Sequence, residues 1–156
     1  MNVLSDLLFS LAKAKGVTIA TAESCTGGLV SGAITDIAGS SAIFDRGFIT
    51  YTNAAKREQL GVHPATLMQY GAVSEQVAAE MAQGALTHSH ASLAVAITGI
   101  AGPGGSEFKP EGRVCFGIAR RDIVTTETVE FGAIGRAQVR QASVDHALTL
   151  LIAALN

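Results

Sequence analysis

Three segments of the chain carry apolar residues at the three- and four-residue spacing of an amphipathic helix. In the first segment these residues are Leu4, Leu7, Leu8 and Leu11. In residues 74–90 they are Val77, Ala78, Met81, Ala82 and Ala85, and near the carboxyl terminus they are Val144, Ala147, Leu148, Leu151 and Leu155. Each stripe predicts a helix that packs against a core, and Ser74 stands where the N-cap of the second helix is expected.

Runs rich in β-branched and apolar residues lie between the helical stretches and predict strands. Residues 16–22 predict a buried strand, and residues 42–52 alternate between apolar and polar as a second strand. Residues 91–99 are apolar on both faces, which is typical of a central parallel strand. Residues 113–131 predict a hairpin of two further strands.

Shorter helical segments fill the intervals between these strands. Two glycines after the first strand lead into a predicted helix over residues 28–38. After the second strand, Asn53 and Gly61 mark the expected N-cap and C-cap of a short helix, and a turn with a helical fragment follows it.

Strands that alternate with helices, followed by a hairpin, predict an α/β fold: a single domain over residues 1–156 with three α/β/α layers and a mixed, mostly parallel sheet. In such sheets the functional loops gather at the carboxyl ends of the strands. This rule brings together the loops that follow residues 22, 50 and 98, and all three carry unusual residues.

Composition narrows the classes of partner. Hydrophobic residues make up 48% of the 156 residues and charged residues 15%, and the net charge of −2 offers no basic surface for nucleic acid.

Asp6 interrupts the first apolar stripe, and no run reaches the ~20 apolar residues of a membrane span, so neither a secretion signal nor a membrane anchor is expected. Cys25 and Cys115 leave one disulfide open but form no disulfide framework, which suits a reducing compartment. We expect a cytoplasmic protein, and a small apolar-rich domain favours a homo-oligomer.

The segment Glu-Ser-Cys-Thr-Gly-Gly places two candidate nucleophiles in a turn between a strand and a helix. Backbone N–H groups from about Cys25 to Gly28 would meet an oxyanion formed there, and the adjacent Gly27 would let the backbone approach a substrate. Cys25 is one candidate nucleophile, because a helix N-terminus lowers the pKa of a thiol. Ser24 is the other, and it needs a stronger base such as a neutral lysine. In the alternative interpretation, Ser24 or Thr26 only caps the helix.

Lys56 is the candidate base. It falls at the third position of the helix that Asn53 is predicted to cap, where the helix dipole favours the neutral amine. Burial would lower its pKa further. Tyr51, at the end of the second strand, can donate a hydrogen bond or relay a proton. The alternative is an ordinary exposed lysine.

Residues 98–106, Thr-Gly-Ile-Ala-Gly-Pro-Gly-Gly-Ser, have the glycine density of a phosphate cradle but lack the Gly-Lys-Ser/Thr of a P-loop. Thr98 and Gly99 stand where the central strand ends, which is a usual place for a ligand contact. Arg136 and Arg140 are four residues apart on one helical face and can grip a phosphate. A flexible loop and a pair of surface arginines are the alternatives.

Metal ligands are not expected. His88 and His90 follow a helix, but no acidic residue or cysteine accompanies them at ligand spacing. We expect the protein to bind a small molecule and to need no cofactor.

Four segments in this order resemble the CinA C-terminal-domain family: Thr-Ala-Glu-Ser-Cys-Thr-Gly-Gly, the run from Gly39 to Lys56, Gly-Ala-Val-Ser-Glu, and Ile-Thr-Gly-Ile-Ala-Gly-Pro-Gly-Gly. The resemblance covers about residues 4–155. It implies a three-layer α/β/α fold with a mixed sheet. It also implies a serine/lysine amidohydrolase that converts nicotinamide mononucleotide and water to nicotinic acid mononucleotide and ammonia, without a cofactor or a required metal.

The resemblance further implies roles for single residues. The positions that match the family's site are Ser24 as the nucleophile, Lys56 as the base, the motif tyrosine Tyr51, Ser41 and Thr98. An arginine near the last helix matches Arg136 or Arg140. Many relatives carry Gly-Asp-Arg before this helix, whereas this chain reads Ile-Gly-Arg, and the missing acid makes Arg140 the preferred phosphate ligand.

Two other functions fit the same residues. One is a nucleotide-binding regulatory module without turnover, because family members are named for links to competence and DNA damage. The other is an amidase that acts on a different small amide.

Overall fold

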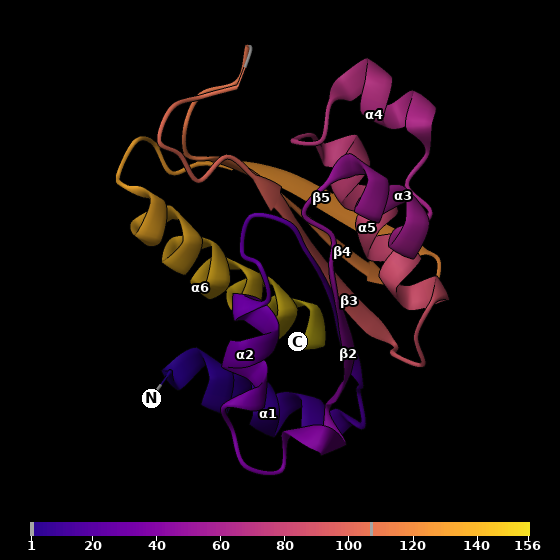
Figure 1. The fold of residues 1–156 in the computed structure, drawn as a ribbon. Coiled ribbons are helices and arrows are strands. Elements are labelled where there is room, and N and C mark those ends of the chain that lie inside the picture. Colours follow the sequence, from indigo (N-terminus) through magenta and orange to yellow (C-terminus); the bar gives the residue numbers. More distant parts are fainter. Residues whose placement is uncertain (1, 107) are drawn as a thin grey trace.

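The computed structural model describes residues 2–106 and 108–156, and their path is shown in Figure 1. In chain order the elements are α1 (Val3–Lys15), β1 (Ile19–Glu23), α2 (Leu29–Thr35), the 3₁₀ turn η1 (Ser40–Ala42), β2 (Phe44–Ile49), α3 (Asn53–Leu60), α4 (Pro64–Tyr70), α5 (Glu75–Thr87), β3 (Leu93–Gly99), β4 (Arg113–Arg120), β5 (Ile123–Glu130) and α6 (Arg136–Leu155). Every predicted helix and strand is present. None of the described helices combines the length and the apolar character that a membrane span requires.

The five strands form one mixed sheet in the order β2-β1-β3-β4-β5. β1 pairs in parallel with β2 on one side and with β3 on the other, whereas β4 pairs antiparallel with both β3 and β5. Only β4 therefore runs against the other four strands, which confirms the predicted mixed, mostly parallel α/β sheet.

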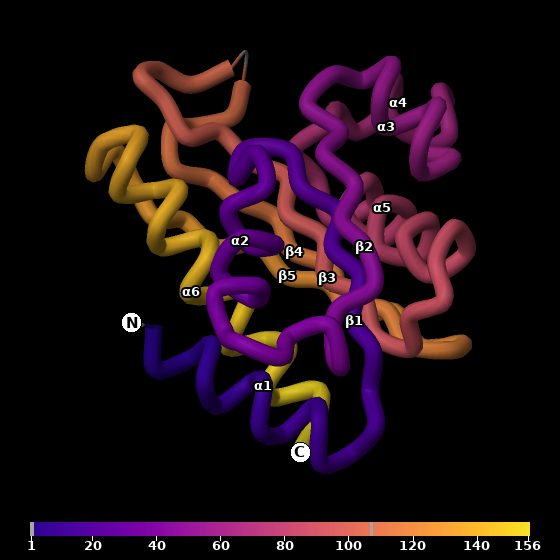
Figure 2. Tube along the Cα trace, turned by 60° about the horizontal axis from the view of Figure 1, so that its bottom comes forward, coloured from indigo at the N-terminus to yellow at the C-terminus, as the bar shows by residue number. Residues whose placement is uncertain are grey.

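Helices cover both faces of the sheet, as Figures 1 and 2 show: α1, α2 and α6 lie on one side and α3, α4 and α5 on the other. The side chains of β3 alternate between these layers. Leu93, Val95 and Ile97 belong to the core under α1 and α6. Ala94 and Ala96 belong to the core under α5. The period-2 alternation of a strand thus divides one apolar run between two cores.

The α5 layer sits unusually close to its neighbours, because glycine occupies the points of contact. A Cβ at Gly117 of β4 would lie 2.6 Å from the carbonyl oxygen of Ala78 on α5. A Cβ at Gly84 of α5 would overlap with the carbonyl oxygen of Leu60 at the end of α3. This packing holds α3, and with it Lys56, against the sheet.

The cap of α3 differs from the prediction by one residue. Thr52, not Asn53, is the N-cap, and its side chain accepts the N–H of Ala55 at 3.0 Å. Lys56 is therefore the fourth helical residue rather than the third. The predicted C-cap at Gly61 has the left-handed φ of 72°, and Ser74 caps α5 by accepting the N–H of Val77. Threonine and asparagine are both good caps, so only the backbone conformation decides between them.

The connections after β1 and β2 cross opposite faces of the sheet and lead to strands on opposite sides of β1. The chain leaves β1 through α2 toward β2, and after β2 it crosses the opposite face through α3, α4 and α5 to reach β3 on the other side of β1. Such a reversal leaves a crevice at the carboxyl ends of β1 and β3.

Candidate functional site

Three loops meet in a cavity of about 340 Å³ at the carboxyl ends of β1, β2 and β3. Of the residues predicted from the sequence, the cavity is lined by Ser24, Cys25, Tyr51, Lys56, Thr98, Gly99 and Arg136. The loops after residues 22, 50 and 98 therefore come together as expected. Within the described part of the chain, the lining of this cavity does not include Thr26, Gly27, Gly28, Ser41 or Arg140.

Ser24 and Lys56 are in direct contact. The Nζ atom of Lys56 lies 3.0 Å from the Oγ atom of Ser24, and it donates to the carbonyl oxygens of Thr50 at 2.8 Å and Tyr51 at 3.3 Å. A neutral amine has two N–H donors and one lone pair. When the two carbonyls accept both N–H bonds, the lone pair is left to face the Ser24 hydroxyl.

The environment of Lys56 favours that neutral form. Its side chain is only 1% exposed, and no acidic group forms a salt bridge with it among the residues that the structure describes. Burial lowers the pKa of Lys56 from its ordinary value of 10.5 to about 8. The direction agrees with the sequence-based expectation, and the alternative of an exposed lysine is wrong.

The pKa of the Cys25 thiol is shifted in the opposite direction from that expected of a nucleophile. It is 5% exposed, and burial raises the pKa of its thiol from 9.0 to about 11. The predicted lowering of the thiol pKa is therefore wrong, because the loss of water outweighs the backbone hydrogen bond and the charges of Lys56 and Arg140, which lower the pKa. A thiol that stays protonated at neutral pH is a poor nucleophile. Both Cys25 and Cys115 are free, so the disulfide left open by the sequence does not form.

The two glycines of the turn set its shape instead of touching the cavity. Gly27 and Gly28 have φ values of 56° and 106°, which other residues rarely adopt. A Cβ on Gly28 would lie 3.0 Å from the side chain of Ile49, so this glycine faces β2. Its N–H donates to the buried carboxylate of Glu23. The expectation that the Gly28 N–H meets an oxyanion is therefore wrong.

Tyr51 and Arg136 meet at the mouth of the cavity. Arg136 donates through Nη2 to the Tyr51 hydroxyl at 3.0 Å and through Nη1 to the carbonyl oxygen of Gly102 at 2.7 Å. The Tyr51 hydroxyl is thus engaged with the arginine, and it is the Tyr51 carbonyl that contacts Lys56. Among the described residues this hydroxyl has no hydrogen bond to Ser24 or Lys56, so the predicted proton relay lacks its contacts.

Arg140 faces the turn rather than the cavity. Its Nε donates to the carbonyl oxygen of Cys25 at 3.1 Å, and its Nη2 lies 3.5 Å from that of Thr26. Of the two arginines, the cavity is lined by Arg136 and not by Arg140, which the sequence had favoured as the phosphate ligand. Arg136 is the first residue of α6 and lines the cavity, whereas Arg140 lies about one helical turn further along α6.

Ser41 lies away from the other site residues. It is exposed in η1, which precedes β2, whereas Tyr51 and Lys56 follow β2. Six strand residues separate the two ends, which corresponds to about 20 Å. Within this chain, the predicted role of Ser41 at the substrate site is not supported.

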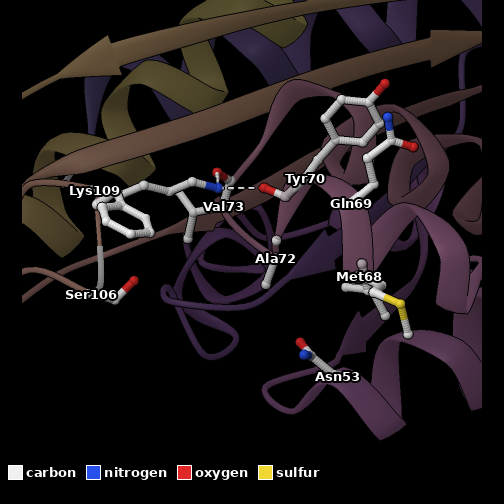
Figure 3. Close-up of a pocket in the computed structure, with 11 residues that line it drawn as sticks. Asn53, Met68, Gln69, Tyr70, Ala72, Val73, Ser106 and Lys109 are labelled. Carbon is white, nitrogen blue, oxygen red and sulfur yellow. Dashed lines mark hydrogen bonds between the residues drawn. The ribbon is translucent and has the colours of Figure 1, made fainter.

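A second cavity of about 640 Å³ adjoins the first and shares Ala72, Val73 and Ser106 with it. In Figure 3, Lys109 reaches across this cavity, and its Nζ donates to the carbonyl oxygens of Tyr70 at 2.5 Å and Val73 at 2.6 Å. The Thr98 hydroxyl donates to the carbonyl oxygen of Ala72 at 2.8 Å. Thr98 and Lys109 together hold the wall between the cavities.

Sequence reasoning missed three contributors: Glu23, Thr50 and Lys109. Thr50 contacts Lys56 through its backbone carbonyl, and a pattern of side chains in the sequence cannot predict such a contact. Glu23 did leave a signal, because a carboxylate at the end of an apolar strand is expected to find buried donors. In residues 2–106 and 108–156, no three His, Cys, Asp or Glu side chains are grouped to hold a metal ion. Metal-independent chemistry stays a prediction.

This chain is similar to known proteins over nearly its whole length. A family model described as the CinA C-terminal domain matches residues 1–155. The nicotinamide-nucleotide amidohydrolase PncC of Enterobacter agglomerans is 56% identical over 146 residues, covering 92% of this chain and 89% of that protein. PncC of Escherichia coli K12 is 52% identical over 151 residues, covering 95% and 90%. A CinA-like protein of Chlorobium phaeobacteroides is 55% identical over 132 residues, which are 82% of this chain but 31% of that longer protein.

Solved structures show the same fold. The crystal structure of a competence/damage inducible protein, CihA, from Agrobacterium tumefaciens superposes with a TM-score of 0.94 at 50% identity, covering 100% of this chain and 97% of that one. The competence damage-inducible protein A of Klebsiella pneumoniae gives a TM-score of 0.94 at 36% identity, covering 97% and 94%.

Proposed function

The chain belongs to the CinA C-terminal domain family, and on this premise we propose that it hydrolyses the amide of nicotinamide mononucleotide to nicotinic acid mononucleotide and ammonia. The names of the PncC relatives, which are nicotinamide-nucleotide amidohydrolases, support the substrate. The contact of 3.0 Å between Lys56 Nζ and Ser24 Oγ is the observation that carries the mechanism.

In the first half-reaction, neutral Lys56 takes the proton of Ser24 while Oγ attacks the carboxamide carbon. The tetrahedral intermediate then collapses: the C–N bond breaks, Lys56 returns the proton to the leaving nitrogen, and ammonia departs. An ester between Ser24 and the nicotinoyl group remains. In the second half-reaction, Lys56 takes a proton from water as the water oxygen attacks the ester carbon. The bond between that carbon and Ser24 Oγ then breaks, and Lys56 returns the proton to Oγ, which leaves nicotinic acid mononucleotide and the serine hydroxyl.

The N–H groups of Cys25 and Thr26 are the donors proposed for the oxyanion. The N–H of Gly27 donates to Ser24 O, and that of Gly28 donates to Glu23. Among the described residues, no backbone carbonyl of another residue accepts the N–H of Cys25 or Thr26. The N–H next to a nucleophilic serine serves as an oxyanion donor in other hydrolases. One such donor contributes about 3–4 kcal/mol to lowering the barrier.

Arg136 is proposed to hold the phosphate of the nucleotide. Its guanidinium lies at the mouth of the cavity, between the Tyr51 hydroxyl and the glycine-rich loop after β3. A guanidinium binds phosphate oxygens through paired charge-assisted hydrogen bonds. Tyr51 is accordingly proposed to orient this arginine, and Thr98 and Gly99 to form the wall beside the pyridine ring.

The decisive experiment measures ammonia release from nicotinamide mononucleotide by the purified chain, with and without a chelator. Activity should fall by more than about 1,000-fold in Ser24→Ala and in Lys56→Ala, while circular dichroism shows both variants folded. Lys56→Arg is the matched control, because it keeps a cation but removes the neutral base. Full activity in Ser24→Ala would point to Cys25 instead.

Two outcomes would support other functions. A rise in melting temperature with nicotinamide mononucleotide but no ammonia would favour a regulatory nucleotide-binding module. Higher kcat/KM on another small amide would indicate an amidase of different specificity.

A further inference from the structure

The carboxylate of Glu23 is fully buried beside the turn that carries Ser24, and the proposed proton transfers do not use it. Its Oε1 accepts the N–H groups of Gly28 at 3.2 Å and Val30 at 2.9 Å. Its Oε2 accepts the N–H of Ser31 at 2.9 Å and the Ser31 hydroxyl at 2.7 Å. All four partners donate, so this side chain acts only as an acceptor, as an ionised carboxylate does.

The main chain of Glu23 links the nucleophile to the base. Its carbonyl accepts the N–H of Thr50 at 2.8 Å, and the carbonyl of Thr50 in turn accepts from Lys56 at 2.8 Å. The next residue, Ser24, donates its N–H to the carbonyl of Ile97 at 2.9 Å. Both ends of the turn are therefore fixed, one by the sheet and the other by the Glu23 carboxylate.

Neighbouring groups leave the carboxylate little freedom to move. The Thr21 hydroxyl lies 2.7 Å from the Ser31 hydroxyl, which donates to Glu23. Gly47 of β2 packs directly on this pair, because a Cβ there would lie 2.5 Å from Ser31 Oγ and 2.6 Å from Thr21 Oγ1. A shift of Glu23 would thus require β2 or α2 to move with it.

We propose that Glu23 is a positioning residue for the reaction at Ser24. Its carboxylate accepts the N–H groups of Gly28, Val30 and Ser31 and so fixes the turn in a shape in which no backbone carbonyl of another residue accepts the N–H groups of Cys25 and Thr26. The inference rests on the proposed hydrolysis. A displacement of about 1 Å in such a site costs about 100-fold in rate.

Glu23→Gln is the direct test, because an amide nitrogen cannot accept and would face an N–H donor. We expect kcat for nicotinamide mononucleotide to fall about 100-fold, with KM changed by less than about threefold. A second readout is the rate at which a fluorophosphonate labels Ser24, which reports nucleophile and oxyanion geometry without the amide substrate. It should slow by a similar factor in folded protein measured well below its melting temperature.

Glu80→Gln is the matched control. Glu80 of α5 is also a carboxylate that caps a helix, because it accepts the N–H of His63 at 2.8 Å and the hydroxyl of Thr66 at 2.6 Å at the start of α4, and it does not line the cavity. We expect wild-type kcat and labelling from it. Ser31→Ala removes one donor from the Glu23 carboxylate and should give a smaller loss than Glu23→Gln.

The outcomes separate this inference from the proposed function. If the wild type releases ammonia and Glu23→Gln keeps wild-type kcat and labelling, the positioning role is overturned and the hydrolysis stands. If the wild type releases no ammonia but Glu23→Gln labels about 100-fold more slowly, the substrate is wrong and the positioning role stands. If Glu23→Gln does not fold, the labelling rate of Ser31→Ala tests the proposal instead. An unchanged labelling rate in that variant overturns the positioning role of Glu23.

Discussion

The Nζ of Lys56 lies 3.0 Å from the Oγ of Ser24, although 32 residues separate the two positions in the sequence. The parallel register of β1 and β2, with Glu23 opposite Ile49, brings the ends of both strands to the same level. Lys56 then enters from the first turns of α3, where two backbone carbonyls orient its amine. A serine is thereby placed against a lysine whose pKa burial lowers to about 8.

The pH dependence of the rate should report Lys56. Its pKa is lowered to about 8 by burial, so the neutral base becomes more abundant as pH rises through that value. We expect kcat/KM for nicotinamide mononucleotide to increase about tenfold per pH unit below pH 8 and to level off above it. A profile measured from pH 6 to 10 checks this. A flat profile over that range would exclude a lysine base.

The same pKa makes a prediction for folding. Between pH 8 and 10.5 the unfolded chain holds a proton on Lys56 that the folded chain has released, so stability rises with pH in this window. The difference between 10.5 and about 8 corresponds to about 3 kcal/mol. Urea unfolding should show the wild type gaining about that much relative to Lys56→Met between pH 8 and 10.5. Parallel curves for the two proteins would contradict the lowered pKa.

Arg136→Met should weaken binding of phosphate-bearing substrate only. Loss of a charge-assisted hydrogen bond costs about 1.5–3 kcal/mol, so KM for nicotinamide mononucleotide should rise about 10- to 100-fold. Nicotinamide riboside, which lacks the phosphate, is the control substrate, and its kcat/KM should change little. Arg140→Met should instead lower kcat for both substrates, because Arg140 donates to the carbonyl of Cys25 in the nucleophile turn.

Two helical glycines should respond oppositely to alanine. Gly32 on α2 is exposed, and a Cβ added there would have nothing within 4 Å, so Gly32→Ala should stabilise the protein by about 0.5–1 kcal/mol. Gly84 on α5 abuts the Leu60 carbonyl, so Gly84→Ala should destabilise it by about 1–3 kcal/mol. Urea unfolding of both variants measures the contrast. Stabilisation by Gly84→Ala would mean that α3 is free to move from α5.

Much of the fold could be predicted from local patterns. The stripe from Val77 to Ala85 predicted α5, and all five of its apolar residues are buried. The alternation and β-branched content predicted each strand, and the rule for carboxyl ends placed the site. These features follow from the 3.6- and 2-residue periods of helix and strand, which the chain carries in its own order of residues. The resemblance carried by four motifs singled out Ser24 and Lys56.

The contacts that control reactivity depended on the tertiary structure. Burial raised the pKa of Cys25, although the local position next to a helix suggested a lower one. Arg136 rather than Arg140 reached the cavity, and Ser41 fell at the far end of β2. Desolvation, helix orientation and strand direction are set by segments distant in the chain. The sequence by itself thus determined the order of the elements and marked Ser24 and Lys56 as candidates, and the packing of the layers decided which candidate residues meet and how burial shifts their pKa values.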